Sequence, residues 1–272
     1  MNLKPGSIKG TPGFMAPEVA TDMVEPNAAS DRFSLAVLLF FIFVIGHPLK
    51  GKRELTLPYD ASDPDQSHRL CALDPVFIFD PDNDSNRPEP GVHDNPLSFW
   101  PIYPASLRKL FIRTFTEGLR DPDARVMENE SRNEMCGLRD AIFHCPHCGA
   151  ENFFDLEQLR QRKALGPCWG CQSLLSNPPR MRMSPAYGSQ LVMLSRGAQL
   201  FPHHLEGDTY NFIAPLAEVV AKPLGLRNLS ADCWSTRTQN GSTMEVKCNE
   251  VLPLTADCHI NFGKIEADVR IT

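Results

Sequence analysis

The stretch "CPHCGAENFFDLEQLRQRKALGPCWGC", Cys145 to Cys171, divides the sequence into a helical region before it and a β-rich region after it. Two Cys-x2-Cys pairs stand nineteen residues apart, a spacing typical of a zinc site. Four thiolates fill a tetrahedral shell and leave no open position, which predicts a structural rather than a catalytic Zn. The predicted ligands are Cys145, Cys148, Cys168 and Cys171.

A redox Cys-x2-Cys pair is the competing interpretation, but it requires a βαβ setting that the flanking sequence does not show. Gly149 and Gly170 follow the cysteines and are predicted to supply the backbone freedom of two tight turns. The other cysteines are predicted to be small buried hydrophobic residues: Cys71, Cys136, Cys233, Cys248 and Cys258.

The composition is that of an ordinary globular chain, with 42% hydrophobic and 22% charged residues. A net charge of −6 without a basic run predicts binding to neither nucleic acid nor an anionic membrane. The apolar run from Leu35 to Gly46 is shorter than the roughly 20 residues that span a bilayer, and it starts too late for a signal peptide. We therefore expect a fully buried helix there, and a cytoplasmic protein with reduced or metal-bound cysteines.

Before the cysteines, the sequence predicts mainly helices. Ser30 or Asp31 is the expected N-cap of the apolar helix, and Gly46 with Pro48 is expected to end it. A second helix should place one apolar face inward: Leu107, Leu110, Phe111, Phe115 and Leu119.

Between these helices, residues 52–104 are dense in Asp, Pro and Asn, which predicts a long surface excursion. Its stretch "DPDNDSN", Asp80 to Asn86, begins like a calcium loop. The sixth position is Ser85 and the twelfth is Gly91, where such a loop needs Gly and Glu, so a solvated turn is favoured.

After the cysteines, a Pro-rich linker (Ser176 to Pro185) leads to segments of period two. Turn signals at "QNGS" and "NFGK" separate the runs, as in a β-sandwich. Two sets are each expected to share one face of a strand: Met244, Val246 and Cys248, and Ala267, Val269 and Ile271.

Three motifs in the first region together resemble one known family. "GTPGFMAPEV" (Gly10 to Val19), "DRFSLAVLLFFIFVIGHPLKG" (from Asp31) and "FTEGLRDPDARV" (to Val126) resemble, in order and spacing, the C-terminal lobe of serine/threonine protein kinases. The substitutions Arg32-Phe33, Ala36 and Phe41 at family-typical positions make it similar to a divergent bacterial-type kinase.

The resemblance implies roles for individual residues. Glu18 would pair with Arg125, and Asp31 would hold the backbone of the catalytic loop. Thr11 would contact the catalytic carboxylate and lysine. The substrate-positioning end of the activation segment would comprise Gly10, Thr11, Ala16, Pro17 and Glu18.

The groups that transfer phosphate are absent from the sequence. It contains no Gly-rich phosphate loop, strand lysine, His-Arg-Asp or Asp-Phe-Gly motif. In the family these motifs precede the activation segment. We therefore expect the C-terminal part of a kinase that is inactive alone, with ATP and Mg bound only in a full-length kinase.

The stretch "GLRNLSADCWSTRTQNGSTMEVKCNEVLPLTADCHINFG", Gly225 to Gly263, resembles the second half of a forkhead-associated domain. The resemblance implies phosphopeptide contacts by Arg196 and Asn240. The usual Ser-x-x-His is not recognisable around "IAPLAEVV", so a structural sandwich and a functional phosphopeptide reader both stay open.

The sequence thus predicts a multidomain chain: a mainly α, kinase-like C-lobe (residues 1–139), a small zinc ribbon (140–178) and an all-β sandwich of forkhead-associated type (187–272). The expected function is that of the C-terminal portion of a serine/threonine protein kinase-like signalling protein. Its expected partner is a protein substrate or a phosphoprotein. The alternative is a non-catalytic protein-binding scaffold with a structural zinc.

Overall fold

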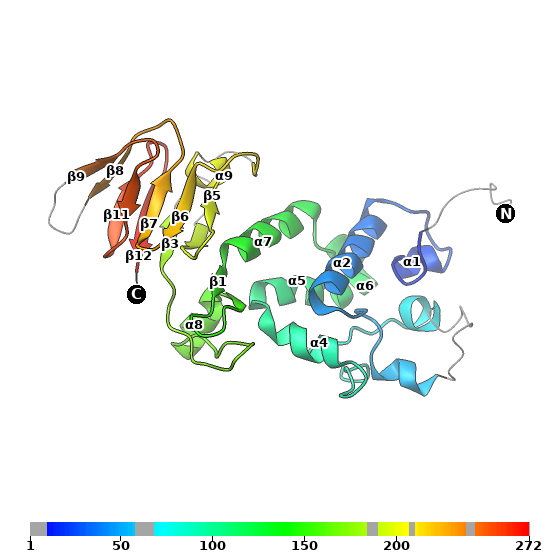
Figure 1. The fold of residues 1–272 in the computed structure, drawn as a ribbon. Coiled ribbons are helices and arrows are strands. Elements are labelled where there is room, and N and C mark those ends of the chain that lie inside the picture. Colours follow the sequence, from blue (N-terminus) through cyan, green and yellow to red (C-terminus); the bar gives the residue numbers. More distant parts are fainter. Residues whose placement is uncertain (1–9, 58–67, 184–189, 207–209, 238–242, 272) are drawn as a thin grey trace. The chain divides into compact units, whose positions relative to one another are not determined.

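The computed structural model of the chain describes residues 10–57, 68–183, 190–206, 210–237 and 243–271. The chain divides into two units, residues 1–134 and 135–272 (Figure 1). The predicted division into three domains stays a prediction.

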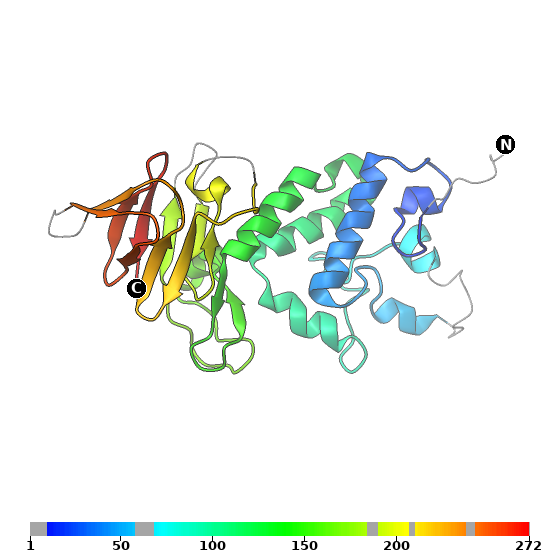
Figure 2. The same ribbon diagram turned by 45° about the horizontal axis from the view of Figure 1, so that its top comes forward.

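The described part of the first unit is helical (Figure 2). Its last helix, α7, begins in this unit and ends in the second. The elements are α1 (Pro17–Ala20), α2 (Ala28–Val44), η1 (Lys52–Thr56), the π-helical turn η2 (Arg69–Leu73), α4 (Asp94–Phe99), η3 (Trp100–Ile102), α5 (Ala105–Phe115), α6 (Glu117–Arg120), η4 (Pro122–Ala124) and α7 (Glu128–Asp140).

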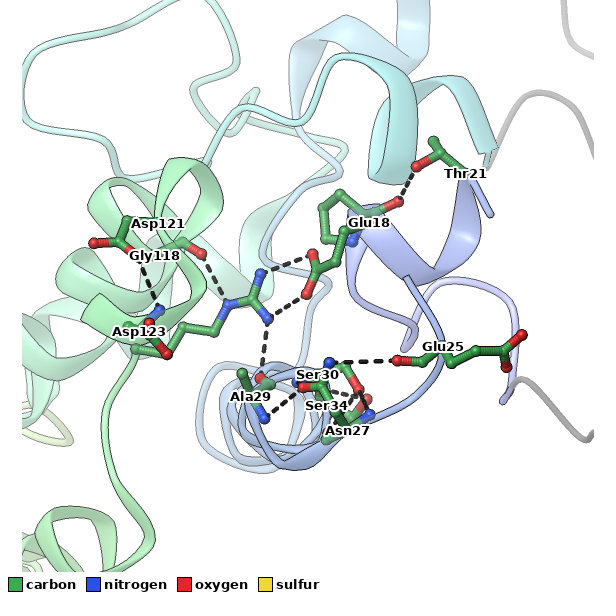
Figure 3. A network of polar contacts seen from close by, with 12 residues as sticks. Glu18, Thr21, Glu25, Asn27, Ala29, Ser30, Ser34, Gly118, Asp121 and Asp123 are labelled. Atoms are coloured by element: carbon green, nitrogen blue, oxygen red, sulfur yellow. Dashed lines mark hydrogen bonds and ion pairs between the residues drawn. The ribbon is translucent and has the colours of Figure 1, made fainter. Parts of the chain in front are cut away.

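Helix α2 begins one turn earlier than predicted. The Asn27 side chain accepts hydrogen bonds from the backbone N–H groups of Ala29 and Ser30, and the Ser30 hydroxyl accepts one from the Asn27 N–H (Figure 3). This reciprocal arrangement is a capping box, so Asn27 is the N-cap and the prediction of Ser30 or Asp31 is wrong.

The end of α2 also differs from the prediction. Ile45, rather than Gly46, adopts the left-handed conformation, with φ 53°. Gly46 is needed for another reason, because a Cβ there would lie 2.6 Å from Cγ of Pro96. The α5 helix likewise ends at Phe115, and Leu119 belongs to α6 instead of continuing the same face.

An aromatic cluster forms the core of the first unit. The Phe40 ring of α2 meets the rings of Phe77, Phe111 and Phe115 edge to face, with centroids 5.2–6.0 Å apart. Phe77 and Ile78 are fully buried. Residues 52–104 therefore contribute to the core, and the prediction of a surface excursion is wrong for their middle part.

A buried amide fixes the same segment. The Asn86 side-chain Oδ1 accepts from the N–H groups of Gly51 and Arg53, and its Nδ2 donates to the carbonyls of Leu49 and Val76. Both donor and both acceptor positions of the buried amide are therefore used, which is what burial requires. A Cβ on Gly51 would lie 2.0 Å from the Asn86 carbonyl oxygen, so only glycine fits there.

The second unit holds all the described strands. A small hairpin of β1 (Ile142–His144) and β2 (Glu151–Phe153) precedes α8 (Leu156–Arg162), and α9 (Pro202–Leu205) lies between later strands. The remaining strands are β3 (Arg180–Met183), β4 (Gln190–Met193), β5 (Gln199–Leu200), β6 (Ala217–Ala221), β7 (Leu224–Asn228), β8 (Trp234–Arg237), β9 (Thr243–Val246), β10 (Val251–Pro253), β11 (Cys258–Asn261) and β12 (Glu266–Arg270).

These later strands form two antiparallel sheets, ordered β4-β3-β12-β11-β8-β9 and β10-β7-β6-β5. One hydrophobic core contains residues of both sheets, among them Met181 and Trp234 of the first and Val219 and Leu226 of the second. The sheets therefore pack face to face around a shared core.

Local predictions in this region had mixed outcomes. Ala267 and Val269 are buried on one face of β12, and Ile271, directly after the strand, is half-buried against the same core. Met244 and Val246 lie two residues apart in β9 and share a face as predicted, although Met244 is exposed, whereas Cys248 lies beyond the end of the strand, so its place on that face is wrong.

The "NFGK" turn joins β11 to β12, with Gly263 at φ 95°, whereas "QNGS" (239–242) lies outside the described residues. Among the five further cysteines, Cys71 and Cys136 are buried as predicted, but Cys233 and Cys248 are exposed and Cys258 is intermediate.

None of the helices in the described ranges is both long enough and apolar enough to cross a membrane.

Candidate functional site

The four predicted zinc ligands lie together in the second unit. Sγ of Cys145 is 3.7 Å from Sγ of Cys171, and Sγ of Cys148 is 3.7 Å from Sγ of Cys168. All four sulfur atoms lie within 4.8 Å of one another. A tetrahedral ion with metal–sulfur bonds of about 2.3 Å requires sulfur–sulfur distances of about 3.8 Å. The cluster therefore has the dimensions to hold a metal ion.

Two equivalent turns present these cysteines. The Gly149 N–H donates to the Cys145 carbonyl at 2.9 Å, and the Gln172 N–H donates to the Cys168 carbonyl at 2.8 Å. Both donors have positive φ, 77° at Gly149 and 61° at Gln172. The predicted turn role of Gly149 is therefore correct, and Gln172 takes the place expected of Gly170. A side chain at Gly170 would be crowded, because its Cβ would lie 3.1 Å from Cβ of Ala150.

The protein environment favours a thiolate at Cys168. Burial opposes ionisation, but the N–H groups of Cys171 and Gly170 and the amide of Asn152 lower the pKa of Cys168 to about 6. At Cys148 the Ala150 N–H lowers the pKa, and the neighbouring thiols together with burial outweigh it and raise the pKa to about 12. Sulfur atoms this close repel one another as thiolates, and a bound dication would remove that penalty.

A second site links the two ends of the first unit. The Arg125 guanidinium donates to both oxygens of Glu18, Nη1 to Oε1 at 2.7 Å and Nη2 to Oε2 at 2.9 Å (Figure 3). Nε donates to the Gly118 carbonyl at 2.8 Å and Nη1 also donates to the Ala29 carbonyl at 2.9 Å. Arg125 is 1% exposed, so its charge is buried and fully paired. Burial alone would raise the pKa of Glu18, but its hydrogen bonds, led by those from Arg125, hold the pKa below the usual value.

The rest of the predicted activation-segment end adjoins this pair. Ala16 and Pro17 are buried, and Pro17 opens α1 at its first position. Gly10 has φ 124°, and the carbonyl of exposed Thr11 accepts from the Phe14 N–H in a turn.

His47 attaches this turn to the loop after α2. Its Nδ1 accepts from the Leu49 N–H at 3.1 Å, and its Nε2 lies 2.7 Å from the Gly13 carbonyl. Because Nδ1 accepts, the proton is on Nε2 and the imidazole is neutral. Burial, more than the charge of Lys50, lowers the pKa of His47 to about 4 against the opposing Gly13 hydrogen bond.

Asp31 begins an exposed face of α2. Within the described parts of the chain, its side chain makes no hydrogen bond or ion pair. On a helix of 3.6 residues per turn, Leu38 and Ile42 lie within about 40° of Asp31. Four apolar residues, which we call the α2 stripe, are 47–61% exposed: Leu38, Phe41, Ile42 and Ile45. The prediction that this helix is fully buried is therefore wrong for one face.

Arg196 is exposed in the turn between β4 and β5, next to Gly197 with φ 81°. It lines a cavity of about 160 Å³ together with Arg139, Asp140, His144 and Ser195. Arg139 belongs to no motif and was not predicted; its guanidinium carbon lies 4.6 Å from the centre of the Phe201 ring. Asn240 lies outside the described residues, so its predicted role stays a prediction.

Neither protein-family models nor curated proteins gave a match to this chain. The kinase-like and forkhead-associated-like assignments therefore rest on the residues themselves.

Proposed function

We propose that the chain is the C-terminal portion of a serine/threonine protein kinase-like signalling protein. The observation that carries the proposal is the buried, two-bond ion pair of Glu18 with Arg125. It joins the Ala-Pro-Glu segment to the Asp-Pro-x-x-Arg segment, the two motifs that the resemblance to kinases couples. Two unrelated surface charges would have no reason to be buried together.

In this proposal the first unit recognises protein substrate. The stretch from Gly10 to Glu18 contacts and positions a segment of the substrate. The Glu18–Arg125 pair attaches this stretch to α2, because Arg125 also donates to the Ala29 carbonyl. Asp31 and the α2 stripe form the face that receives the catalytic loop. That role accounts for an exposed acidic side chain followed by exposed apolar side chains on one helix face.

Phosphoryl transfer itself needs groups that cradle the phosphates, bind Mg²⁺ and orient the attacking hydroxyl. Among the motifs of this sequence, none supplies them. The proposed contribution of this chain is therefore substrate positioning, and ATP with Mg belongs to a kinase half that carries those motifs.

The reading frame upstream of Met1 tests the proposal. We expect an in-frame Gly-rich loop, strand lysine, His-Arg-Asp and Asp-Phe-Gly. The extended protein should phosphorylate a protein substrate, and Glu18→Gln should reduce that activity. The present chain should bind no ATP–Mg²⁺ in native mass spectrometry. An upstream frame without these motifs, or ATP bound to the present chain, would contradict the proposal.

A second candidate is a protein-binding scaffold whose β-sandwich reads phosphopeptides. It is favoured by the cavity that Arg139 and Arg196 line, since arginine side chains suit a phosphate. The Asp140 carboxylate in the same cavity opposes an anion, which is why this candidate ranks second.

Fluorescence anisotropy with a phosphothreonine peptide and its unphosphorylated form tests the scaffold. Selective binding that Arg196→Ala abolishes would support it. Arg182→Ala, which removes an exposed arginine of β3, is the matched control. Equal binding of both peptides would exclude a phosphate reader.

A further inference from the structure

A second cluster of ligating side chains lies in the second unit, apart from the four cysteines. Asp140 at the end of α7 and His203 and His204 of α9 offer ligand atoms that all lie within 4.8 Å of one another. His203 is 3% exposed and His204 is fully buried. Neither the composition nor the motifs of the sequence drew attention to these residues.

Hydrogen bonds fix the protonation of His204. Its Nδ1 accepts from the Phe201 N–H at 2.9 Å, so the imidazole proton is on Nε2. Nε2 lies 3.1 Å from Oδ2 of Asp140 and donates to it. His204 therefore orients the Asp140 carboxylate, and the second carboxylate oxygen stays available for another partner.

His203 has the opposite arrangement. Its Nδ1 lies 3.1 Å from the Asn211 carbonyl and must donate to it, which leaves the lone pair on Nε2. This Nε2 is buried and has no hydrogen-bond partner among the described residues. A buried nitrogen without a partner is costly, so a site of this kind calls for a ligand.

We propose that His203 Nε2 and the Asp140 carboxylate bind a divalent transition-metal ion, with His204 as a positioning residue. The surrounding hydrogen bonds are those that metal ligands need. A ligating histidine donates its other N–H to a carbonyl, and a ligating carboxylate is itself hydrogen-bonded. Asp140 also lines the 160 Å³ cavity, so solvent reaches the carboxylate and can complete the coordination shell.

The donor set selects the class of ion. An imidazole nitrogen with a carboxylate suits Zn²⁺, Co²⁺ or Ni²⁺ better than Mg²⁺ or Ca²⁺, which take oxygen ligands. The Arg139 guanidinium lies 4.6 and 4.7 Å from the centres of the Phe201 and Phe212 rings, and the Phe212 ring in turn contacts His203, so a positive charge beside the site opposes a bound cation. Attraction to the Asp140 carboxylate alone would therefore bind a cation weakly. The affinity for the metal ion depends on Nε2 of His203.

Cobalt titration of the full chain carrying one zinc ion tests the proposal. We expect a second metal ion per chain in native mass spectrometry. Its absorption bands should lack the sulfur-to-cobalt charge transfer that a cysteine site produces. Asp140→Asn and His203→Gln should each weaken this second binding at least tenfold while the first zinc ion is retained.

Further substitutions distinguish cobalt bound at this site from cobalt bound at another histidine. His259→Gln is the control, because His259 is exposed beside Glu266 and Asp268 and could take up cobalt at the surface. It should leave the second ion in place. If His203→Gln fails to fold, Asp140→Asn decides, since the amide oxygen still accepts from His204 Nε2. A wild-type chain that binds only one ion in tenfold cobalt excess, or a second ion that persists in Asp140→Asn, would overturn the proposal and leave water as the partner of His203.

Discussion

Arg125 holds Glu18 by two hydrogen bonds across 107 residues of chain and donates its remaining hydrogen bonds to the carbonyls of Gly118 and Ala29. One guanidinium thereby connects α1, the first turn of α2 and the segment around α6. The Phe33 ring lies against its face, with the centroid 5.1 Å from Cζ. Because the Arg125 guanidinium makes all these contacts, substitutions of Arg125 or Glu18 should affect the stability of the first unit.

Replacing Glu18 by Gln should destabilise the first unit by about 3–5 kcal/mol, because it leaves the Arg125 charge buried without its partner. Arg125→Lys should also be strongly destabilising, since an ammonium group cannot make the two-bond contact. Urea-dependent hydrogen exchange of the α2 amides measures both. Glu128→Gln, which removes an exposed partner of Arg32, is the control and should change little. Equal effects of Glu18→Gln and Glu128→Gln would show that the buried pair has no special role.

We expect the four-cysteine cluster to bind a metal ion, and removal of that ion should unfold the segment from Cys145 to Cys171, because four close sulfur atoms have little other reason to stay together. Cys171→Ser should abolish the sulfur-to-cobalt absorption of the cobalt-substituted chain. Cys233→Ser and Cys248→Ser, at exposed cysteines outside the cluster, should retain it. A Cys171→Ser chain with unchanged absorption would mean that the metal is held elsewhere.

Acid should weaken the first unit through His47. Its pKa is about 4 in the folded chain, below the usual value of 6.5, so the unfolded chain binds the proton more readily. Stability is therefore complete above pH 6.5 and falls as the pH drops toward 4, by up to about 3 kcal/mol. Urea unfolding at several pH values checks this, with His47→Gln as the comparison. If both proteins lose stability in parallel over this range, His47 is not the cause.

A charged side chain introduced into the α2 stripe should leave the stability of the first unit nearly unchanged. Ile42→Glu, at a residue 61% exposed, should change the free energy of unfolding by no more than about 0.5 kcal/mol and reduce binding of a hydrophobic dye. Phe40→Ala on the opposite face should cost about 3–5 kcal/mol, because Phe40 is fully buried. A loss of several kcal/mol for Ile42→Glu would indicate that the stripe is covered in solution.

Asn86→Asp should cost about 2 kcal/mol or more, although the two side chains have the same shape. The change replaces two donors by an oxygen that faces the carbonyls of Leu49 and Val76. Asn83→Asp, in the same turn, should be nearly neutral because that side chain only accepts, from the Ser85 N–H. Thermal unfolding of the two variants compares them directly, and similar losses would refute the role of the amide.

Features set by local chemistry could be predicted from the sequence. The cysteine cluster follows from spacing alone, since two short turns and four thiols are sufficient to define it. The association of Glu18 with Arg125 came from a resemblance between motifs, because no local pattern connects residues 107 positions apart.

Other features depend on tertiary contacts, which the overall composition of a segment does not indicate. Phe77 and Ile78 are buried within a segment rich in Asp, Pro and Asn, and the apolar run there, Val76 to Phe79, is too short to show a helical or strand period. The start of α2 was misplaced because Asn27 and Ser30 are both good caps, and only the reciprocal hydrogen bonds decide between them. The approach of Asp140 to His203 and His204 depends on how α7 meets α9, which no stretch of sequence encodes by itself.

The last strand, β12, pairs with β3 on one side and β11 on the other, in the interior of its sheet. During synthesis, β3 and β11 therefore lack their shared neighbour until Glu266 to Arg270 have been made. A ribosome that terminates before Glu266 would release a chain with two unpaired strand edges, which are templates for aggregation. The order of the strands thus makes synthesis of β12 a condition for a continuous sheet, and chains that stop before it should be recognised and degraded as misfolded.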